Sequence, residues 1–171
     1  RRQLAQRMPM ASTIKCHAIY DTPFWRDAGW SGEVVADGKP ISVVFDNTTH
    51  DGTASLVSFI VGGPARVWSQ RTTQERREAV LGCLERWFGA EAASPVQWID
   101  KDWSEEPWTG GCPIGVPMVG TLTTVGHALR APVGRVHWAG TETALEWMGF
   151  MEGALASGDR VAEEICEVDG E

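Results

Sequence analysis

The segment from Arg135 to Cys166 constrains the fold more than any other part of this chain. Its first residues, Val136 to Ala139, form a short hydrophobic run that predicts a strand ending at Gly140. A polar turn at 141–143 follows, and the remaining residues have the apolar periodicity of a long helix. The segment therefore predicts a strand, a tight turn and an amphipathic helix in succession.

In the expected helix, apolar and small residues recur at steps of three and four, which places them on one face. Glu152, Asp159 and Glu163 share another face and are expected to be solvated. The residues of the apolar face are Met148, Met151, Leu155, Gly158, Ala162 and Ile165.

Two glycines, Gly149 and Gly153, lie near the expected start of this helix. Each glycine costs about 1 kcal/mol relative to alanine in a helix, so we expect a close neighbour to require them. A strand, a glycine turn and a helix N-terminus together can also cradle an anionic or planar ligand. From the residues alone, ordinary packing of a strand against a helix is an equally good interpretation.

The same segment resembles the C-terminal flavin-binding signature of the flavin-dependent monoamine oxidase family. The residues that carry the resemblance are Gly-Thr-Glu-Thr at 140–143, Trp147, and Gly-Phe-Met-Glu-Gly-Ala at 149–154. The resemblance implies that FAD is the cofactor. It also implies that Gly140 and Thr141 approach the pyrophosphate and ribityl chain of FAD, and that Gly149, Phe150 and Met151 run against the isoalloxazine ring.

A second resemblance to this family lies in IKCHAIYDTPFW, residues 14–25. The alternation of Ile14 to Tyr20 predicts a strand with Ile14, Cys16 and Ala18 on one face. The family resemblance implies that Lys15 holds a water molecule near the reactive ring nitrogen of the flavin. Without the resemblance, a surface lysine on an edge strand is the simpler interpretation of Lys15.

A third resemblance joins Trp103 to Cys112, which follows two glycines. In mitochondrial-type members this cysteine is bonded to the flavin 8α-methyl group and the tryptophan lies beside the ring. The resemblance therefore implies a flavin contact for Cys112 and a cavity position for Trp103. Two tyrosines that face each other in those members are replaced here by Pro113 and Phe150. The replacements argue against neurotransmitter-type substrates but leave the flavin chemistry intact.

The remaining pattern predicts an α+β fold with a mixed or antiparallel sheet, as part of a larger fold. Residues 34–36 and 41–45 flank a turn at 37–40 and predict a hairpin. Residues 55–61 and 96–99 predict further strands, the first closed by Gly62-Gly63-Pro64. We assign residues 1–108 to a substrate domain and 109–171 to the C-terminal part of an FAD-binding domain.

The clearest separate helix is predicted for Gln74 to Phe88. Thr72 and Glu75 match a capping box, and Gly89 provides a C-terminal stop. Val80, Cys83 and Leu84 belong to its apolar stripe, so we expect this helix to have a structural role and Cys83 to be a core residue.

Composition excludes several classes of function. The net charge of −8 argues against nucleic acid, because phosphate binding requires clustered Lys and Arg. The four cysteines and four histidines are scattered, so no metal site is expected. No signal peptide, transmembrane run or membrane anchor is visible, and a cytoplasmic protein is the natural expectation.

The chain begins at Arg1, without an initiator Met and within a helical pattern, and it contains no GxGxxG. We therefore expect a fragment that lacks the N-terminal dinucleotide-binding segment and is inactive by itself. A homodimer is one assembly open to the intact protein.

The function implied by the resemblance is that of an FAD-dependent amine oxidase, which oxidises amines to imines and reduces oxygen to hydrogen peroxide. Its small-molecule partners are the amine and oxygen, and the expected catalytic residues are Lys15, Trp103 and Phe150. Two alternatives stay open: a non-catalytic remnant of a flavoprotein, and a related flavin desaturase or amino-acid oxidase.

Overall fold

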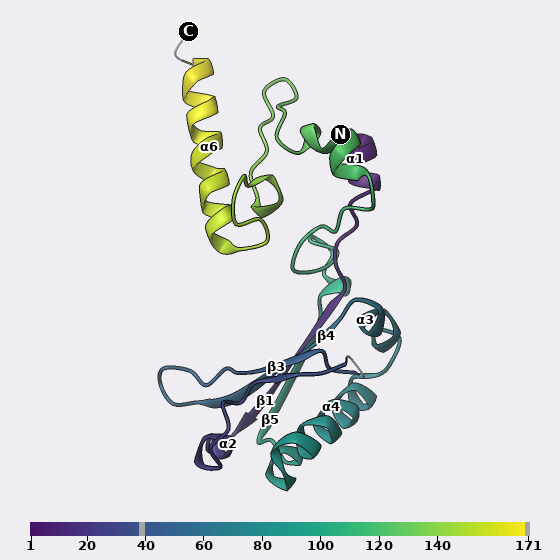
Figure 1. Ribbon diagram of the computed structural model, residues 1–171, viewed down its shortest axis with the longest axis vertical. Helices are drawn as coiled ribbons and strands as arrows, with labels where there is room; N and C mark the ends of the chain where they lie inside the picture. Colours follow the sequence, from purple (N-terminus) through teal and green to yellow (C-terminus); the bar gives the residue numbers. More distant parts are fainter. Residues whose placement is uncertain (38–39, 170–171) are drawn as a thin grey trace. The chain divides into compact units, whose positions relative to one another are not determined.

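The computed structural model describes residues 1–37 and 40–169, which form two compact units (Figure 1). The first, here called the sheet unit, comprises Ser12–Cys112. The second, here called the helix unit, combines Arg1–Ala11 with the chain from Pro113 onward.

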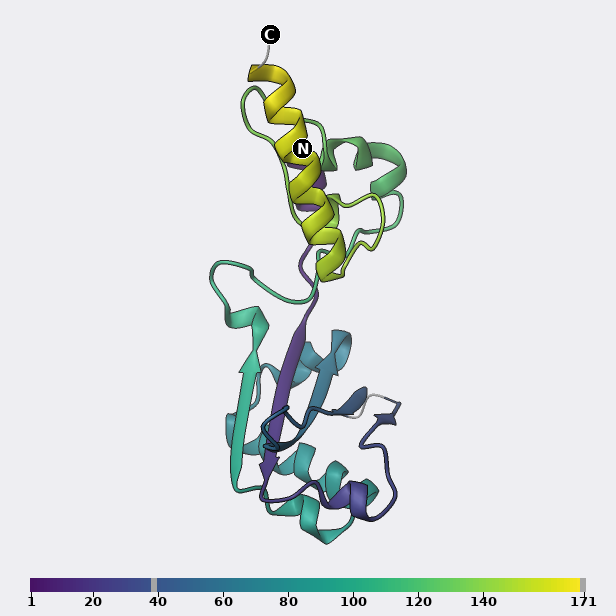
Figure 2. The same ribbon diagram turned by 90° about the vertical axis from the view of Figure 1, so that its left-hand side faces the viewer.

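The sheet unit is built on a five-stranded sheet with the order β2-β3-β4-β1-β5, in which every pairing is antiparallel (Figure 2). The sequence prediction of an α+β fold with an antiparallel sheet is therefore confirmed. The strands are β1 (Thr13–Tyr20), β2 (Val34–Val35), β3 (Val43–Asp46), β4 (Ala54–Val61) and β5 (Gln97–Asp102).

Strand β1 alternates between two environments, as its sequence predicts. Ile14, Cys16 and Ala18 are buried and point to the side called here the core face. Lys15 and His17 are half-buried on the opposite side, called here the open face. Burial raises the pKa of the Cys16 thiol to about 12, so this cysteine is an inert core residue.

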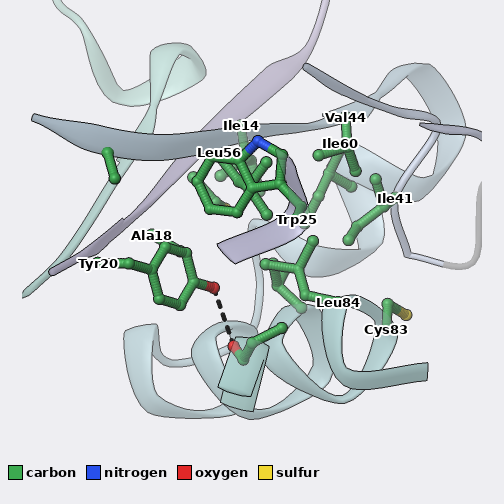
Figure 3. Packing of buried hydrophobic residues seen from close by; sticks show 14 of the residues in the cluster. Ile14, Ala18, Tyr20, Trp25, Ile41, Val44, Leu56, Ile60, Cys83 and Leu84 are labelled. Atoms are coloured by element: carbon green, nitrogen blue, oxygen red, sulfur yellow. Dashed lines mark hydrogen bonds between the residues drawn. The ribbon is translucent and has the colours of Figure 1, made fainter. Parts of the chain in front are cut away.

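Helix α4 (Thr73–Phe88) packs its apolar stripe against the core face, where Leu84 meets side chains of the sheet (Figure 3). The predicted capping box is present, since Thr72 and Glu75 bond each other's backbone amides. Trp25, from the short helix α2 (Phe24–Asp27), is fully buried in the same core. The hydroxyl of Tyr20 donates to the carbonyl of Ala92 at 2.9 Å, and burial raises the pKa of this phenol.

A buried ion pair ties α4 to β5. The Nε of Arg76 donates to Oδ2 of Asp100 at 2.6 Å, and both side chains are almost fully buried. The same guanidinium also donates to the carbonyl of Arg71 and the hydroxyl of Thr73. Each charge is therefore compensated inside the unit.

Other elements of the sheet unit differ in detail from the sequence prediction. The expected stop at Gly62-Gly63-Pro64 is the first turn of helix α3 (Gly62–Trp68), where proline is tolerated. The predicted hairpin is present as β2 and β3, while Gly38 and Lys39 of its turn lie outside the described residues. Two 3₁₀ helices complete the unit, η1 (Ala90–Ala93) and η2 (Trp103–Glu105).

The helix unit contains a short N-terminal helix, a second short helix and one long helix. Its small core consists of Leu4, Ala128 and Leu129, with Met8 and Val125 packed partly against it. Its elements are α1 (Arg2–Gln6), α5 (Thr121–Val125), η3 (Gly126–Leu129), η4 (Thr141–Thr143) and α6 (Met151–Asp169).

Two predictions for this unit are wrong. Val136–Ala139 forms no strand, and only a bridge between Val133 and Val136 is present, because no neighbouring strand of the described residues pairs with it. Helix α6 begins at Met151, so Met148 and Gly149 precede it. The predicted solvation of Glu152, Asp159 and Glu163 is confirmed.

Candidate functional site

Lys15 lies on the open face of the sheet, between two aromatic side chains. Its Nζ is 5.5 Å from the ring centroid of Phe59 on β4 and 5.7 Å from that of Trp103. These distances are within the range of cation–π attraction. The strand thus brings the predicted Lys15 and Trp103 together on one surface.

Trp103 is positioned by the turn that ends β5. Asp102 caps η2 by accepting hydrogen bonds from the backbone N and the hydroxyl of Ser104, at 2.9 and 2.6 Å. Burial alone raises the pKa of Asp102, but the hydrogen bonds from Ser104 and Ser69 outweigh it and lower the pKa. The carboxylate therefore stays charged and fixes the turn that carries the indole.

A second lysine, Lys101, belongs to the same group, and sequence reasoning missed it. Its Nζ is 5.8 Å from the Trp103 ring centroid and 3.2 Å from Oε2 of Glu106. In the sheet register it lies directly opposite Lys15, an arrangement that is unfavourable for like charges. A strand alignment that paired 14–19 with 97–102 would have revealed it. The Trp103 indole and the Glu106 carboxylate compensate the two ammonium groups.

Cys112 ends the sheet unit and follows Gly110 and Gly111, which both have positive φ angles of 63° and 154°. Its carbonyl accepts a hydrogen bond from the Thr13 hydroxyl at 2.8 Å. This bond fixes the last residue of the sheet unit to the start of β1. The thiol is half-buried. The two glycines give the backbone a course that other residues rarely adopt.

In the helix unit, the predicted residues gather around the hydroxyl of Thr141. This oxygen accepts a hydrogen bond from the Gly149 amide at 2.6 Å and donates to the carbonyl of Phe150 at 3.0 Å. The amide of Gly140 donates to the hydroxyl of the buried Ser157 on α6 at 2.9 Å. Gly140, Thr141, Gly149 and Phe150 therefore form one connected group.

The start of α6 explains both glycines of the signature. Gly149 has a φ of 91°, which favours glycine. A Cβ at Gly153 would lie 2.3 Å from the carbonyl oxygen of Trp147, so only glycine fits there. The close neighbour that the sequence led us to expect at Gly153 is thus the backbone carbonyl of Trp147. Phe150 and Met151 are 63% and 85% exposed at this helix start and present an apolar surface.

A charged network holds α6 to the preceding segment, and it too was absent from the sequence prediction. Glu164 contacts Arg160 and accepts from Nδ1 of His137 at 2.9 Å. Arg160 also donates to the carbonyl of Trp138 at 2.7 Å and to the hydroxyl of Thr143 at 3.3 Å. The hydrogen bond from His137, together with Arg160, lowers the pKa of Glu164.

The predicted site residues therefore fall into two groups. The sheet unit carries Lys15, Trp103 and Cys112, and the helix unit carries Gly140, Thr141, Gly149, Phe150 and Met151. Within residues 1–37 and 40–169, no three His, Cys, Asp or Glu side chains are arranged to hold a metal ion. Among these same residues, none of the helices combines the length and apolar character needed to cross a membrane.

Known sequences that are similar to this chain belong to one family. The model of the family described as flavin containing amine oxidoreductase matches residues 1–166. A probable flavin-containing monoamine oxidase A of Dictyostelium discoideum is 49% identical over 96% of this chain and 36% of its own length. Amine oxidase [flavin-containing] B of Canis lupus familiaris is 40% identical over 99% of this chain and 34% of its own length. The chain thus spans about a third of the length of these relatives.

Solved structures of amine oxidases have the same fold over the matched part. The cyclohexylamine oxidase from Brevibacterium oxydans IH-35A gives a TM-score of 0.93 at 37% identity, covering 99% of this chain and 38% of that one. A putrescine oxidase bound to putrescine gives a TM-score of 0.92 at 33% identity, covering 97% of this chain and 37% of that one.

Proposed function

Because the chain belongs to the family of flavin-containing amine oxidoreductases, we propose that it forms the C-terminal part of an FAD-dependent amine oxidase. The chemistry that bound FAD supplies is the acceptance of a hydride equivalent from the carbon next to the substrate nitrogen, which gives an imine, and its delivery to oxygen, which gives hydrogen peroxide. Small primary amines are the proposed substrates, in keeping with the names of the similar cyclohexylamine and putrescine oxidases.

The observation that carries this proposal is the position of Lys15 beside Trp103 on the open face, 5.7 Å from ammonium to ring centroid. In our proposal the Lys15 ammonium donates a hydrogen bond to a water molecule near the reactive ring nitrogen of the flavin, so the reacting carbon of the amine also lies near Lys15. Trp103 provides a flat apolar wall beside Lys15 that orients the amine. For the exposed ring of Phe150 we likewise propose an apolar contact with the substrate. No side chain is required as a general base.

The residues of the helix unit fit a planar cofactor with partial negative charge. The exposed rings of Trp147 and Phe150 and the exposed Met151 offer apolar contact to a flat ring. The N-terminus of the long helix α6 favours negative charge, and the Thr141 hydroxyl holds the loop that leads to it. We propose that Gly140, Thr141, Gly149, Phe150 and Met151 hold the FAD.

We further propose that Cys112 contacts the flavin, with residues 1–108 serving the substrate and 109–171 the cofactor. The positive φ angles of Gly110 and Gly111 support a close approach at this point. Acid precipitation of the intact protein decides whether the contact is a covalent bond. Yellow colour that stays in the pellet, and is lost in Cys112→Ala, identifies a bond through this sulfur; colour in the supernatant identifies a non-covalent contact.

The proposal is tested on the intact protein with a peroxide-coupled assay and a panel of primary amines. We expect bound flavin and peroxide release, and we expect Trp103→Leu to lower kcat/KM at least tenfold. Trp108→Leu is the matched control, because Trp108 is 92% exposed and only five residues away in sequence. A protein that retains its flavin but releases no peroxide with any amine would contradict the proposal and favour a non-catalytic or desaturase role.

A further inference from the structure

His17 occupies a distinctive position on the open face of the sheet. It follows Lys15 by two residues in β1, so both side chains point to the same side. Its neighbours across the sheet are Val57 on β4 and Ile99 on β5. His17 is therefore a hydrogen-bonding group set into an apolar strip.

The imidazole of His17 is not used to hold the described part of the chain together. Within residues 1–37 and 40–169 it makes no hydrogen bond, although it is half-buried. A structural histidine in such a position is normally satisfied by a partner. Its polar atoms are therefore available to a bound molecule.

The charges around His17 keep its ring neutral. Burial, and then the nearby Lys15 ammonium, lower its pKa from the usual value near 6.5. The charged groups that face it are Lys15 on its own strand and Lys101, a diagonal neighbour on β5. Strand β4 faces it with the uncharged Val57 and Phe59. A neutral imidazole both donates and accepts hydrogen bonds.

We propose that His17 is a specificity-determining residue, which hydrogen-bonds a hydroxyl group at the far end of the amine substrate. This inference rests on the proposed function, which places the reacting carbon near Lys15. Two residues along a strand span about 7 Å, so the recognised hydroxyl lies about that far from the reacting end. A second ammonium group is disfavoured there, because Lys15 and Lys101 would repel it.

The test compares two amines of equal length on the intact oxidase, 5-amino-1-pentanol and hexylamine, which differ by a terminal hydroxyl in place of a methyl group. We expect His17→Leu to raise KM for the amino alcohol about fivefold, the value of one neutral hydrogen bond, with kcat retained. KM for hexylamine should not rise. His17→Gln keeps a donor and an acceptor and should retain most of the preference for the hydroxyl.

A control variant and a replacement variant make the result decisive. His50→Leu, at an exposed turn, should leave both substrates unaffected. If His17→Leu does not fold, His17→Phe, which keeps a ring, replaces it. An equal rise in KM for both amines, which leaves the ratio of the two KM values unchanged, overturns the specificity role of His17. The amine oxidase activity would still stand. A wild-type protein that oxidises neither these nor other amines overturns the proposed function, and the role of His17 falls with it.

Discussion

In the sheet unit the apolar side chains of Trp25 and Leu84 are fully buried, whereas in the helix unit those of Phe150 and Leu155 are exposed. The sheet unit has one continuous core between its sheet and α4 (Figure 3). In the described part of the helix unit, the buried apolar cluster is the small one around Leu4 and Leu129. The two units thus differ in how much apolar surface they remove from water.

The helix unit compensates with polar contacts. Ser157 and Arg160 bind the backbone of Gly140 and Trp138, and Thr141 binds that of Gly149 and Phe150. Such contacts fix geometry but contribute little net stability, typically about 1 kcal/mol each. The comparison teaches that the sheet unit is held by its own core, while the helix unit has a precise backbone and an apolar surface free to bind.

The largest effect is expected from the buried ion pair of the sheet unit. Asp100→Ala leaves the Arg76 guanidinium buried without its partner, and we expect a loss of about 4 kcal/mol in the free energy of unfolding. Hydrogen exchange of the β1 amides measures it. The double variant Arg76→Met, Asp100→Leu removes both charges and should recover most of the loss. A small effect of Asp100→Ala would mean that water reaches this site.

A matched pair of leucines tests the difference in burial directly. Leu84→Ala should cost about 3 kcal/mol, since this side chain is fully buried under the sheet. Leu155→Ala, at a side chain that is 66% exposed on α6, should cost less than about 0.5 kcal/mol in this chain. Denaturant titration of the two variants gives both values. Similar losses at the two positions would remove the distinction between the units.

Two glycines of α6 sharpen the view that the helix unit depends on backbone fit. Gly153→Ala should destabilise the start of the helix by about 2 kcal/mol, because its Cβ would overlap the Trp147 carbonyl at 2.3 Å. Gly158→Ala meets nothing within 4 Å and should stabilise the helix by about 1 kcal/mol. Hydrogen exchange of the α6 amides reports both. Equal effects at the two positions would contradict the close contact.

The smallest effect concerns pH. The pKa of Glu164 is lowered by its hydrogen bond from His137 and by Arg160, so its stabilising contribution is complete above the pKa of the unfolded carboxyl, about 4.3. That contribution disappears as the pH falls through the lower folded pKa. NMR titration of the Glu164 carboxyl should therefore give a midpoint below 4.3, and His137→Ala should move it upward. An unchanged midpoint in the variant would separate His137 from this network.

The sequence predicted the sheet unit well because its elements carry their signals locally. The alternation in residues 14–20 and the capping box of Thr72 and Glu75 each appear in the structure where the pattern placed them. The helix at Gly62–Trp68 was missed, because Gly-Gly-Pro signals a turn unless Pro64 falls in a first helical turn.

The candidate site was less accessible to sequence reasoning, because its contacts depend on register and on long loops. Lys101 joins Lys15 and Trp103 only through the pairing of β1 with β5. The bond between Thr141 and Gly149 requires the positive φ angles of Trp147 and Gly149, which delay the start of α6. The apolar periodicity of the sequence extends the predicted helix back through Met148 and Gly149, because periodicity does not reveal a loop of this kind.

Strand β5 is one edge of the sheet, and an exposed edge is a template on which a second chain can add a strand. Native proteins often place lysine on such edges, because pairing would strip water from its ammonium group. Lys101 meets this condition, with Ile99 the one large apolar residue exposed beside it. We therefore expect the lysine that faces Lys15 also to oppose strand addition at this edge of the chain, and a change to valine to favour such pairing.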